Sequence, residues 1–516
     1  MAMHQNQNVI VESKVGIIGA GISGIAAAKQ LSHYNPMVFE ATNSIGGVWK
    51  HCSYRSTKLQ TPRCDFEFSD FPWPQRNNSS FPSYLEILEY LDNYASHFDV
   101  LKFVKFNSKV VEIRYVGDHT RKSELGSLLT GRPVWEIAVH NSQLNTLQWY
   151  AFEFVVVCIG KYGDVPRMPE YPPNKGAEIF KGKVLHTMDY SKLNKEEAQE
   201  LFRGKKVAVV GYKKSAIDLA MECAEANAGC KEGKPCTVVI RTLHWTVPSY
   251  WIWGLPFFLF YSTRSSQFLQ ERPNQTLFRA LLCFLSSPMR KAISKFIESY
   301  LSWKLPLEKY GLKPEHPFVE DYASCQMAIL PENFFSEADK GNIQFKMASK
   351  WWFWSGGLEF EDKTRLEADV VVLATGFDGK KKLQCLLPDP FQSLIVDSSG
   401  IMPLYRGTIH PMIPNMAFVG YVESVSNLQT AELRCKWLAR LADEKFKLPS
   451  VKKMIEQTSE EIQVMKRTTR FYKRHCISTF SINHSDEICQ EMGWSHLRKN
   501  NWFSEAFSPY SSQDYV

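Results

Sequence analysis

A glycine-rich turn near the N-terminus constrains this chain more than any other feature. Residues 15–40 read VGIIGAGISGIAAAKQLSHYNPMVFE, in which a short apolar run is followed by G-x-G-x-x-G at Gly19, Gly21 and Gly24. Strong helix formers come next, and a second apolar run ends in Glu40, 21 positions after the first glycine. A G-x-G-x-x-G without such flanks is often an ordinary loop. Here strand, turn, helix, second strand and terminal acid are in register, which predicts a dinucleotide-binding βαβ unit.

Each glycine of this turn has its own physical role. Gly19 permits the tight turn, Gly21 lets a pyrophosphate approach, and Gly24 lets the helix pack on the strand. The helix N-terminus offers unpaired N–H groups and a partial positive charge to the phosphates. Glu40 would accept a hydrogen bond from a ribose hydroxyl and would repel a 2′-phosphate, so we expect FAD or NAD here and not NADP. The expected contacts are Gly19, Ala20, Gly21, Ile22, Ser23, Gly24 and Glu40, with Gly47, Val48 and Trp49 from the next loop, for which an ordinary glycine turn is the alternative.

A degraded copy of the pattern begins at residue 206. The strand-like residues 206–210 precede a turn that starts at Gly211, a helical run follows, and a second strand ends in Arg241. The planar guanidinium of an arginine can grip a 2′-phosphate through two hydrogen bonds, so we expect NADPH here; a solvated strand end is the alternative for Arg241. The expected contacts are Gly211, Tyr212, Lys213, Lys214, Ser215, Ala216 and Arg241.

Two residues of this second turn depart from the fingerprint. Lys213 and Ala216 stand where the second and third glycines belong. Alanine is tolerated in the third place. Lysine in the second place should crowd the pyrophosphate with its Cβ, and its charge compensates only if the backbone shifts.

Two further apolar strands end in glycine, at Gly160 and at Gly376 of an Ala-Thr-Gly sequence. Ligands of open α/β sheets sit beyond the carboxyl ends of the strands, so we expect both glycines and the start of a helix at residue 427 to meet at the first cofactor. The predicted fold class is α/β, with two dinucleotide-binding (Rossmann-like) domains and the NADPH domain inserted into the FAD domain. The expected boundaries are 1–170 for the first part of the FAD domain, 171–335 for the NADPH domain with an aromatic-rich helical insertion, and 336–516 for the rest of the FAD domain with the C-terminal helices.

Composition excludes several classes of function. The chain has 61 Lys and Arg against 54 Asp and Glu, and the net charge of +7 is spread without a long basic run, which does not indicate nucleic-acid binding. The 12 cysteines contain no C-x-x-C pair, so we expect no metal site, no disulfide framework and reduced thiols in the cytoplasm.

No signal peptide or membrane anchor is visible in the sequence. The longest apolar run is residues 250–261, YWIWGLPFFLFY, whereas a bilayer-spanning helix needs about 20 residues. A buried or interface-lining segment is the favoured interpretation of this run, and a membrane-surface patch is the alternative because of its tryptophans. The expected location is therefore the cytoplasm, with a peripheral membrane contact left open.

The segment between the two turns resembles a family motif. Residues 180–190, FKGKVLHTMDY, match F-x-G-x-x-x-H-x-x-x-Y, which is similar to the identifying motif of flavin-containing monooxygenases; related Baeyer–Villiger monooxygenases end it in tryptophan, and this chain has Tyr190. The resemblance covers about residues 14–480, and EFSDFPWP, KYGDVPR and MPLYRGTIHP resemble the plant branch. For His186 of the motif we expect a role in holding the linker near NADPH, not proton chemistry. Gln60 aligns with an asparagine near the flavin in animal members, and Arg434 replaces a usual glutamine.

The resemblance implies a function that the spacing of motifs does not show. It implies FAD and NADPH as cofactors and a C4a-hydroperoxyflavin that transfers one oxygen atom from O₂ to a small amine or amino acid. The leading substrate is pipecolate, which would be N-hydroxylated in plant defence. Oxygenation of a sulfide or of a keto acid is the first alternative, and a flavin-bound sensor without NADPH turnover, motivated by Lys213, is the second. The flavin carries the chemistry, so no catalytic residue is assigned beyond Gln60 as a candidate near the flavin.

Overall fold

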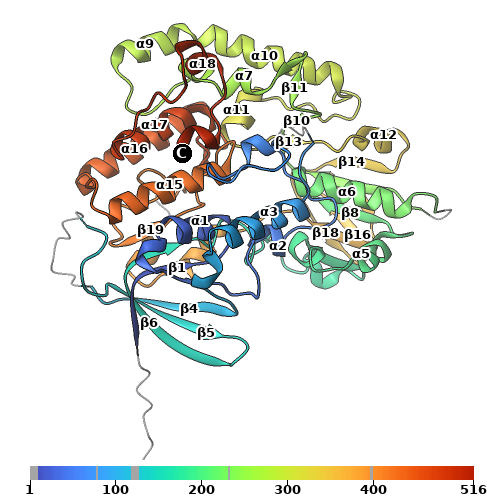
Figure 1. The fold of residues 1–516 in the computed structure, drawn as a ribbon. Coiled ribbons are helices and arrows are strands. Elements are labelled where there is room, and N and C mark those ends of the chain that lie inside the picture. Colours follow the sequence, from blue (N-terminus) through green and yellow to red (C-terminus); the bar gives the residue numbers. More distant parts are fainter. Residues whose placement is uncertain (1–9, 77–79, 118–126, 231–232, 396–398) are drawn as a thin grey trace, which may run out of the picture.

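The computed structural model of the protein (Figure 1) describes residues 10–76, 80–117, 127–230, 233–395 and 399–516. One mostly parallel sheet and one all-parallel sheet organise the fold. In Figure 1, helices α9 (Leu277–Leu285) and α10 (Ser287–Lys304) run along the top of the molecule, above α16 (Val451–Thr468) and α17 (Ser481–Glu491). The expected α/β class with two Rossmann-type sheets is confirmed.

A seven-stranded sheet carries the first glycine turn. Its main path is β3-β2-β1-β6-β5-β4, and β19 pairs with β6. β1 is parallel to β2 and β6, whereas β5 is antiparallel to β4 and β6. The last four residues of β1 are buried, as expected for a strand covered on both faces. The strands are β1 (Val11–Ile18), β2 (Met37–Phe39), β3 (Val104–Lys105), β4 (Ser108–Tyr115), β5 (Trp135–Asn141), β6 (Thr146–Val157) and β19 (Met416–Phe418).

Helices from both ends of the chain cover this sheet. α1 (Ile22–Gln30), which begins at the glycine turn, packs against the late helix α15 (Asn427–Ala442). The core between them contains small side chains such as Ala27 together with Trp437. The other helices of this part are α2 (Val48–His51), α3 (Tyr84–His97), α13 (Gly379–Gln384), α14 (Phe391–Leu394), α16 (Val451–Thr468), α17 (Ser481–Glu491) and α18 (Trp502–Phe507).

A five-stranded, all-parallel sheet carries the second turn. Its order is β14-β9-β8-β18-β7. All four residues of β8 and of β18 are buried, which fits the centre of a sheet covered on both faces. Its strands are β7 (Lys183–His186), β8 (Val207–Val210), β9 (Cys236–Ile240), β14 (Ile343–Met347) and β18 (Val370–Leu373). Its helices are α4 (Thr187–Tyr190), α5 (Lys195–Phe202), α6 (Lys214–Asn227) and α12 (Phe334–Asp339). A separate three-stranded sheet is formed by β15 (Trp351–Trp354), β16 (Gly357–Phe360) and β17 (Arg365–Glu367).

The expected boundary at residue 335 does not coincide with the end of this sheet. β14 and β18 both lie beyond residue 335, yet they pair with β9 and with β7 and β8. The sequence of β18 is an apolar run that ends before Gly376, and it would look the same in either sheet. The composition of a buried parallel strand does not show which strands it pairs with. The return of the chain to the first sheet therefore comes after Leu373.

A helical insertion between β9 and β14 bears the longest apolar run. Within residues 250–261, Ile252 and Phe257 are buried, but Trp251 is 54% and Trp253 43% exposed. The prediction of burial is therefore wrong for part of the run. The insertion consists of β10 (Thr246–Val247), β11 (Trp251–Ile252), β12 (Leu255–Pro256), β13 (Ala328–Ile329), α7 (Phe258–Tyr261), α8 (Arg264–Phe268), α9 (Leu277–Leu285), α10 (Ser287–Lys304) and α11 (Phe318–Ala323).

Helix α9 presents further apolar side chains to the surface, with Leu277 91% and Phe284 74% exposed. Arg279 and Cys283 supply its buried face. No described helix combines the length and the apolar character that crossing a bilayer demands.

Candidate functional site

A cavity of about 1260 Å³ lies at the carboxyl ends of the first sheet's strands. Ile18, Phe39 and Cys158, at or just past the ends of β1, β2 and β6, line it. Its volume exceeds that of a typical site for one small ligand, so it has room for a dinucleotide and a substrate. The predicted residues that line it are Gly19, Gly21, Ile22, Ser23, Glu40, Gly47, Val48, Trp49, Gln60, Gly160 and Asn427, whereas the predicted Ala20 and Gly24 are not part of its described lining.

The glycines of the first turn differ in why they are glycine: some are required by packing or backbone conformation, and one borders the cavity. A Cβ on Gly24 would lie 1.8 Å from the carbonyl oxygen of Gly19, so the helix can approach the strand only if residue 24 is glycine. Gly19 itself has a φ of +97°, which favours glycine. A Cβ on Gly21 would meet only Gly47, at 3.7 Å, which is an ordinary contact. The protein's own packing does not demand a glycine at position 21, and the bare surface there faces the cavity.

Helix α1 directs its N-terminus into the same cavity. Gly21 is its N-cap, and in the part of the chain that the structure describes no side chain caps it. The first N–H groups of a helix have no partners inside the helix, so an anion can take them. A bare glycine surface beside uncapped N–H groups fits the pyrophosphate of a dinucleotide.

Glu40 is held rigidly at the end of β2. Its Oε2 accepts a hydrogen bond from Ala20 N at 2.8 Å, and its Oε1 accepts from Thr42 N at 2.9 Å and Thr42 Oγ1 at 2.8 Å. An ionised carboxylate has about four acceptor positions, so one remains for a ribose hydroxyl. The side chain also lines the cavity.

The second turn, which starts at Gly211, departs from the fingerprint, and the structure shows where each of its residues lies. A Cβ on Gly211 would lie 2.6 Å from the carbonyl oxygen of Ala374, so close packing of β8 on β18 requires this glycine. Lys213 is the N-cap of α6 in an extended conformation, φ −118°, which any residue adopts. The conformation itself therefore does not require glycine, and the crowding of a pyrophosphate by the Cβ of Lys213 stays a prediction. Ala216 is buried in the first turn of α6.

Lys213 lies in an unusual electrostatic setting. Crowding by the surrounding protein, and then repulsion from Arg474, lower the pKa of Lys213 to about 7, while Glu423 acts in the opposite direction. Its side chain keeps access to solvent, which screens part of this effect. Arg241, the other predicted cation of this loop, is exposed just beyond the end of β9.

His186 connects two segments of the second sheet. Met188 N donates to its Nδ1 at 3.1 Å, so its Nε2 carries the proton and donates to the carbonyl oxygen of Gly376 at 3.0 Å. Burial lowers the pKa of His186, which keeps the ring neutral. Gly376 follows β18 of the second sheet and does not line the cavity. The expectation that Gly376 and Gly160 both lie at the first cofactor is therefore wrong for Gly376.

Gln60 connects the part of the protein built on the first sheet to the helical insertion. Its Oε1 accepts a hydrogen bond from the backbone N of Ile329, in β13, at 3.0 Å. It lines the cavity together with Tyr322, Cys325 and Met327 of the insertion. This arrangement places Gln60 at the wall shared by the two parts, and its contact with a flavin stays a prediction.

A charged cluster in the cavity wall was not predicted. Glu423 Oε1 lies 2.8 Å from Lys161 Nζ, and Glu423 Oε2 accepts from Arg474 Nη2 at 2.8 Å. Tyr162 OH donates to Glu423 Oε1 at 2.5 Å. Burial would raise the pKa of Glu423, but Arg474 and Lys161 outweigh burial and lower the pKa to about 2. Its members come from segments more than 300 residues apart, so no local pattern could have revealed the cluster.

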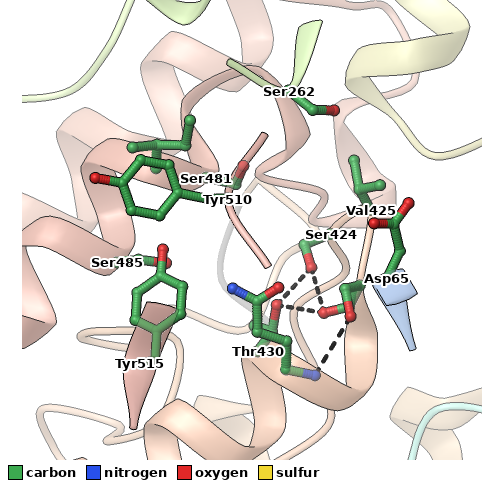
Figure 2. A pocket seen from close by; sticks show the side chains of 12 residues that line it. Asp65, Ser262, Ser424, Val425, Thr430, Ser481, Ser485, Tyr510 and Tyr515 are labelled. Carbon is green, nitrogen blue, oxygen red and sulfur yellow. Dashed lines mark hydrogen bonds between the residues drawn. The ribbon is translucent and has the colours of Figure 1, made fainter. Parts of the chain in front are cut away.

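A smaller polar pocket of about 50 Å³ adjoins the cavity through Ser424 and Val425, which line both. Figure 2 shows Ser424 and Thr430 next to each other in its wall, and a hydrogen bond of 2.5 Å joins their hydroxyl oxygens. Asp65 accepts a hydrogen bond from Tyr250 OH at 2.9 Å, and burial raises its pKa. The space suffices for a few waters, not for a second organic ligand.

Two cysteines that we expected to be reduced form a disulfide. Cys325 and Cys476 are bonded, with their Cα atoms 6.1 Å apart and 151 residues between them in sequence. The expectation of free thiols is wrong for this pair, because the absence of C-x-x-C spacing excludes only bridges between close neighbours.

His244, His316 and Asp321 form a buried group of the kind that can bind a metal. Asp321 Oδ1 lies 2.8 Å from His244 Nδ1, and Asp321 Oδ2 accepts from Trp245 N at 2.6 Å and lies 3.0 Å from His316 Nε2. Both carboxylate oxygens therefore already have protein partners, which favours a hydrogen-bonded network over a metal site.

The chain resembles proteins of known class. The family model "Flavin-binding monooxygenase-like" matches residues 12–499. A protein of Arabidopsis thaliana named "Probable flavin-containing monooxygenase 1" is 63% identical over 519 residues, which cover 99% of this chain and 98% of the relative.

Solved structures share the fold. OTEMO, in complex with FAD and NADP, is 20% identical with a TM-score of 0.64 and covers 90% of this chain and 92% of its own. The S-allyl-L-cysteine S-oxygenase from Allium sativum is 19% identical with a TM-score of 0.57 and covers 94% and 90%. At such identities the likeness is one of fold.

Proposed function

The chain belongs to the flavin-binding monooxygenase-like family, and we propose that it hydroxylates the nitrogen of a small cyclic amino acid, pipecolate, at the expense of NADPH and O₂. Members of this family are FAD- and NADPH-dependent monooxygenases, so the chain is an enzyme of that class. The alternative of a sensor without turnover is set aside on that ground.

We place FAD on the first glycine turn. The single observation that carries this placement is Gly21, a glycine that faces the cavity although the protein's own packing would accept a Cβ there. Gly21 and the N-terminus of α1 would hold the pyrophosphate, and Glu40 the ribose. When bound, the reduced flavin supplies one oxygen atom of O₂ to the substrate.

We place NADPH on the second turn, where α6 begins. The N-terminus of α6 is uncapped by any described side chain, so its N–H groups would bind the pyrophosphate, and exposed Arg241 would bind the 2′-phosphate. His186 would fix the linker beside this site through Gly376. Tyr212, Lys214 and Ser215 complete the proposed loop contacts.

The protein's part in the reaction is to bind, orient and exclude water. Gln60, fixed by Ile329 N, would orient a ligand at the wall between the lobes. The nitrogen must enter as a neutral amine, because a lone pair is needed to take the oxygen atom. The substrate assignment rests on the resemblance of segments such as FKGKVLHTMDY and MPLYRGTIHP to the plant branch, and on the charged wall of the cavity, which suits a zwitterion. A role in plant defence belongs to the same proposal.

A thioether amino acid is the second candidate substrate. The observation that favours it is the shared fold with the garlic S-oxygenase, whose substrate is S-allyl-L-cysteine. Oxygenation of a keto acid is a further alternative within the same chemistry. Purified yellow protein should consume O₂ and NADPH with pipecolate, and the mass of the product distinguishes nitrogen oxygenation from both rivals. A product from a rival substrate, with only H₂O₂ from pipecolate, would refute the proposed substrate.

A further inference from the structure

Lys161, Arg474 and Glu423 form one charge cluster in the wall of the main cavity, and all three line it. Lys161 follows β6, Glu423 follows β19, and Arg474 lies in the segment after α16. The backbone holds Glu423 beside the segment that carries Arg474: Glu423 N donates to His475 O at 2.9 Å, and Ile477 N donates to Glu423 O at 2.9 Å. Main-chain pairing therefore fixes these two residues, and Lys161 joins them through its side chain.

The cluster carries more positive charge than the protein neutralises. Lys161 and Arg474 face one carboxylate, that of Glu423, which leaves a net charge of about +1 at neutral pH. Lys161 Nζ also donates to Arg474 O at 2.6 Å, so among the described residues these contacts occupy two of its three N–H groups. Arg474 Nε is buried and has no partner in the described part of the chain. Both cations thus have donors that the protein's own acceptors leave unsatisfied.

An anion that enters the cavity can reach the exposed parts of both cationic side chains, although Arg474 Nε itself is enclosed. The side chains of Lys161 and Arg474 are 21% and 29% exposed, whereas that of Glu423 is 7% exposed. The acid lies behind the two bases and orients them. A planar carboxylate matches the geometry of a guanidinium, and a lysine adds a point charge beside it.

The cluster lies in the same cavity as Gln60 and the residues of the insertion. We propose that Lys161 and Arg474 bind the carboxylate of the substrate, so that the enzyme selects amino acids over amines that lack a carboxylate. Glu423 is a positioning residue in this account. The proposal rests on the proposed function for the identity of the amino acid, but the selection for a carboxylate applies to any amino-acid substrate of the same cavity.

The test compares substrates that differ only in the carboxylate. For wild type and variants, product formation is measured with pipecolate and piperidine, and in parallel with S-methylcysteine and 2-(methylthio)ethylamine. The quantity compared is the ratio of kcat/KM for the acid to kcat/KM for its partner without the carboxylate. Loss of a hydrogen bond to a charged group corresponds to roughly a ten- to one-hundred-fold change, so Arg474→Gln and Lys161→Met should each lower this ratio by about that factor.

The variant Glu423→Gln should act in the opposite direction. It removes the acid that competes for both cations, so the ratio should rise, whereas a purely structural role predicts that every disruption of the cluster lowers activity on both substrates alike. The variant Arg474→Lys keeps a positive charge opposite Glu423 and removes only the planar fork, so it should fold and still lower the ratio. This variant keeps the test valid if Arg474→Gln alone misfolds.

The outcomes separate this inference from the proposed function. A wild type that oxygenates S-methylcysteine and not pipecolate refutes the proposed substrate, and the thioether pair then still tests the carboxylate site. An unchanged ratio in Arg474→Gln and Lys161→Met, or a ratio that Glu423→Gln lowers, overturns the inference. A rise in KM for NADPH in place of a change in the ratio also overturns it, because the cluster would then serve the dinucleotide.

Discussion

A Cβ on Gly24 would lie 1.8 Å from the carbonyl oxygen of Gly19, whereas a Cβ on Gly21 would find its nearest described neighbour at 3.7 Å. Two glycines three residues apart therefore serve different ends. Gly24 allows helix α1 to pack on the turn, and Gly21 leaves the cavity open. The distinction can be measured because one substitution should affect folding and the other should affect binding.

Gly24→Ala should destabilise the protein even without cofactor. Forcing a methyl group into backbone typically costs about 1–3 kcal/mol or more, so the apoprotein should melt several degrees lower or fail to fold. Thermal unfolding of the apoprotein, followed by circular dichroism, measures this effect.

Gly21→Ala should leave the apoprotein close to wild type and reduce FAD binding. The added methyl group would occupy the surface that faces the pyrophosphate. The measurement is the ratio of flavin absorbance to protein absorbance after purification with added FAD. A full flavin content in this variant would move FAD away from the first turn.

Arg241→Ala should weaken NADPH and have little effect on NADH. Each hydrogen bond to a charged group contributes on the order of 1.5–3 kcal/mol, so KM for NADPH should rise about tenfold or more. Steady-state O₂ uptake with both cofactors checks this, and Arg203→Ala, at an exposed arginine after α5, is the matched control. Equal effects on both cofactors would place the 2′-phosphate elsewhere.

Lys213→Met should change the pH dependence of stability. In the folded protein the pKa of Lys213 is about 7 against an ordinary 10.5, so between these values the unfolded chain binds more protons and stability rises with pH. The variant removes this titration, so it should exceed wild type in melting temperature at pH 6, and the difference should shrink toward pH 10. Melting curves across this range provide the test. A difference that is constant with pH would show that the lysine keeps its ordinary pKa.

The elements with strong local signals could be predicted from the sequence. The strand that ends before Glu40 and the helix from Asn427 appear where the sequence indicates them, and the helix expected after Gly24 is present but already begins at Ile22. Such signals are local, since they depend on residues within one turn or one strand.

Features that depend on distant partners could not be predicted. β18 has the composition of any buried parallel strand, and only its pairing with β7 and β8 assigns it to the second sheet. Trp251 and Trp253 are exposed because the short hairpin of β11 and β12 turns them outward, which hydrophobicity alone does not specify. The charged wall of the cavity escaped prediction for the same reason, since Lys161 and Arg474 become neighbours only in the folded chain.

The identity of the substrate is the central claim, and one measurement tests it most directly. Purified enzyme with FAD and NADPH is given pipecolate, an indole keto acid and S-methylcysteine in separate reactions, and product mass and H₂O₂ yield are recorded for each. We predict that pipecolate gains one oxygen atom, with one NADPH and one O₂ consumed per product and little H₂O₂, and that its rate rises with pH as the amine loses its proton. Exclusive formation of H₂O₂ with pipecolate, together with an oxygenated product from either of the other two compounds, would contradict the account.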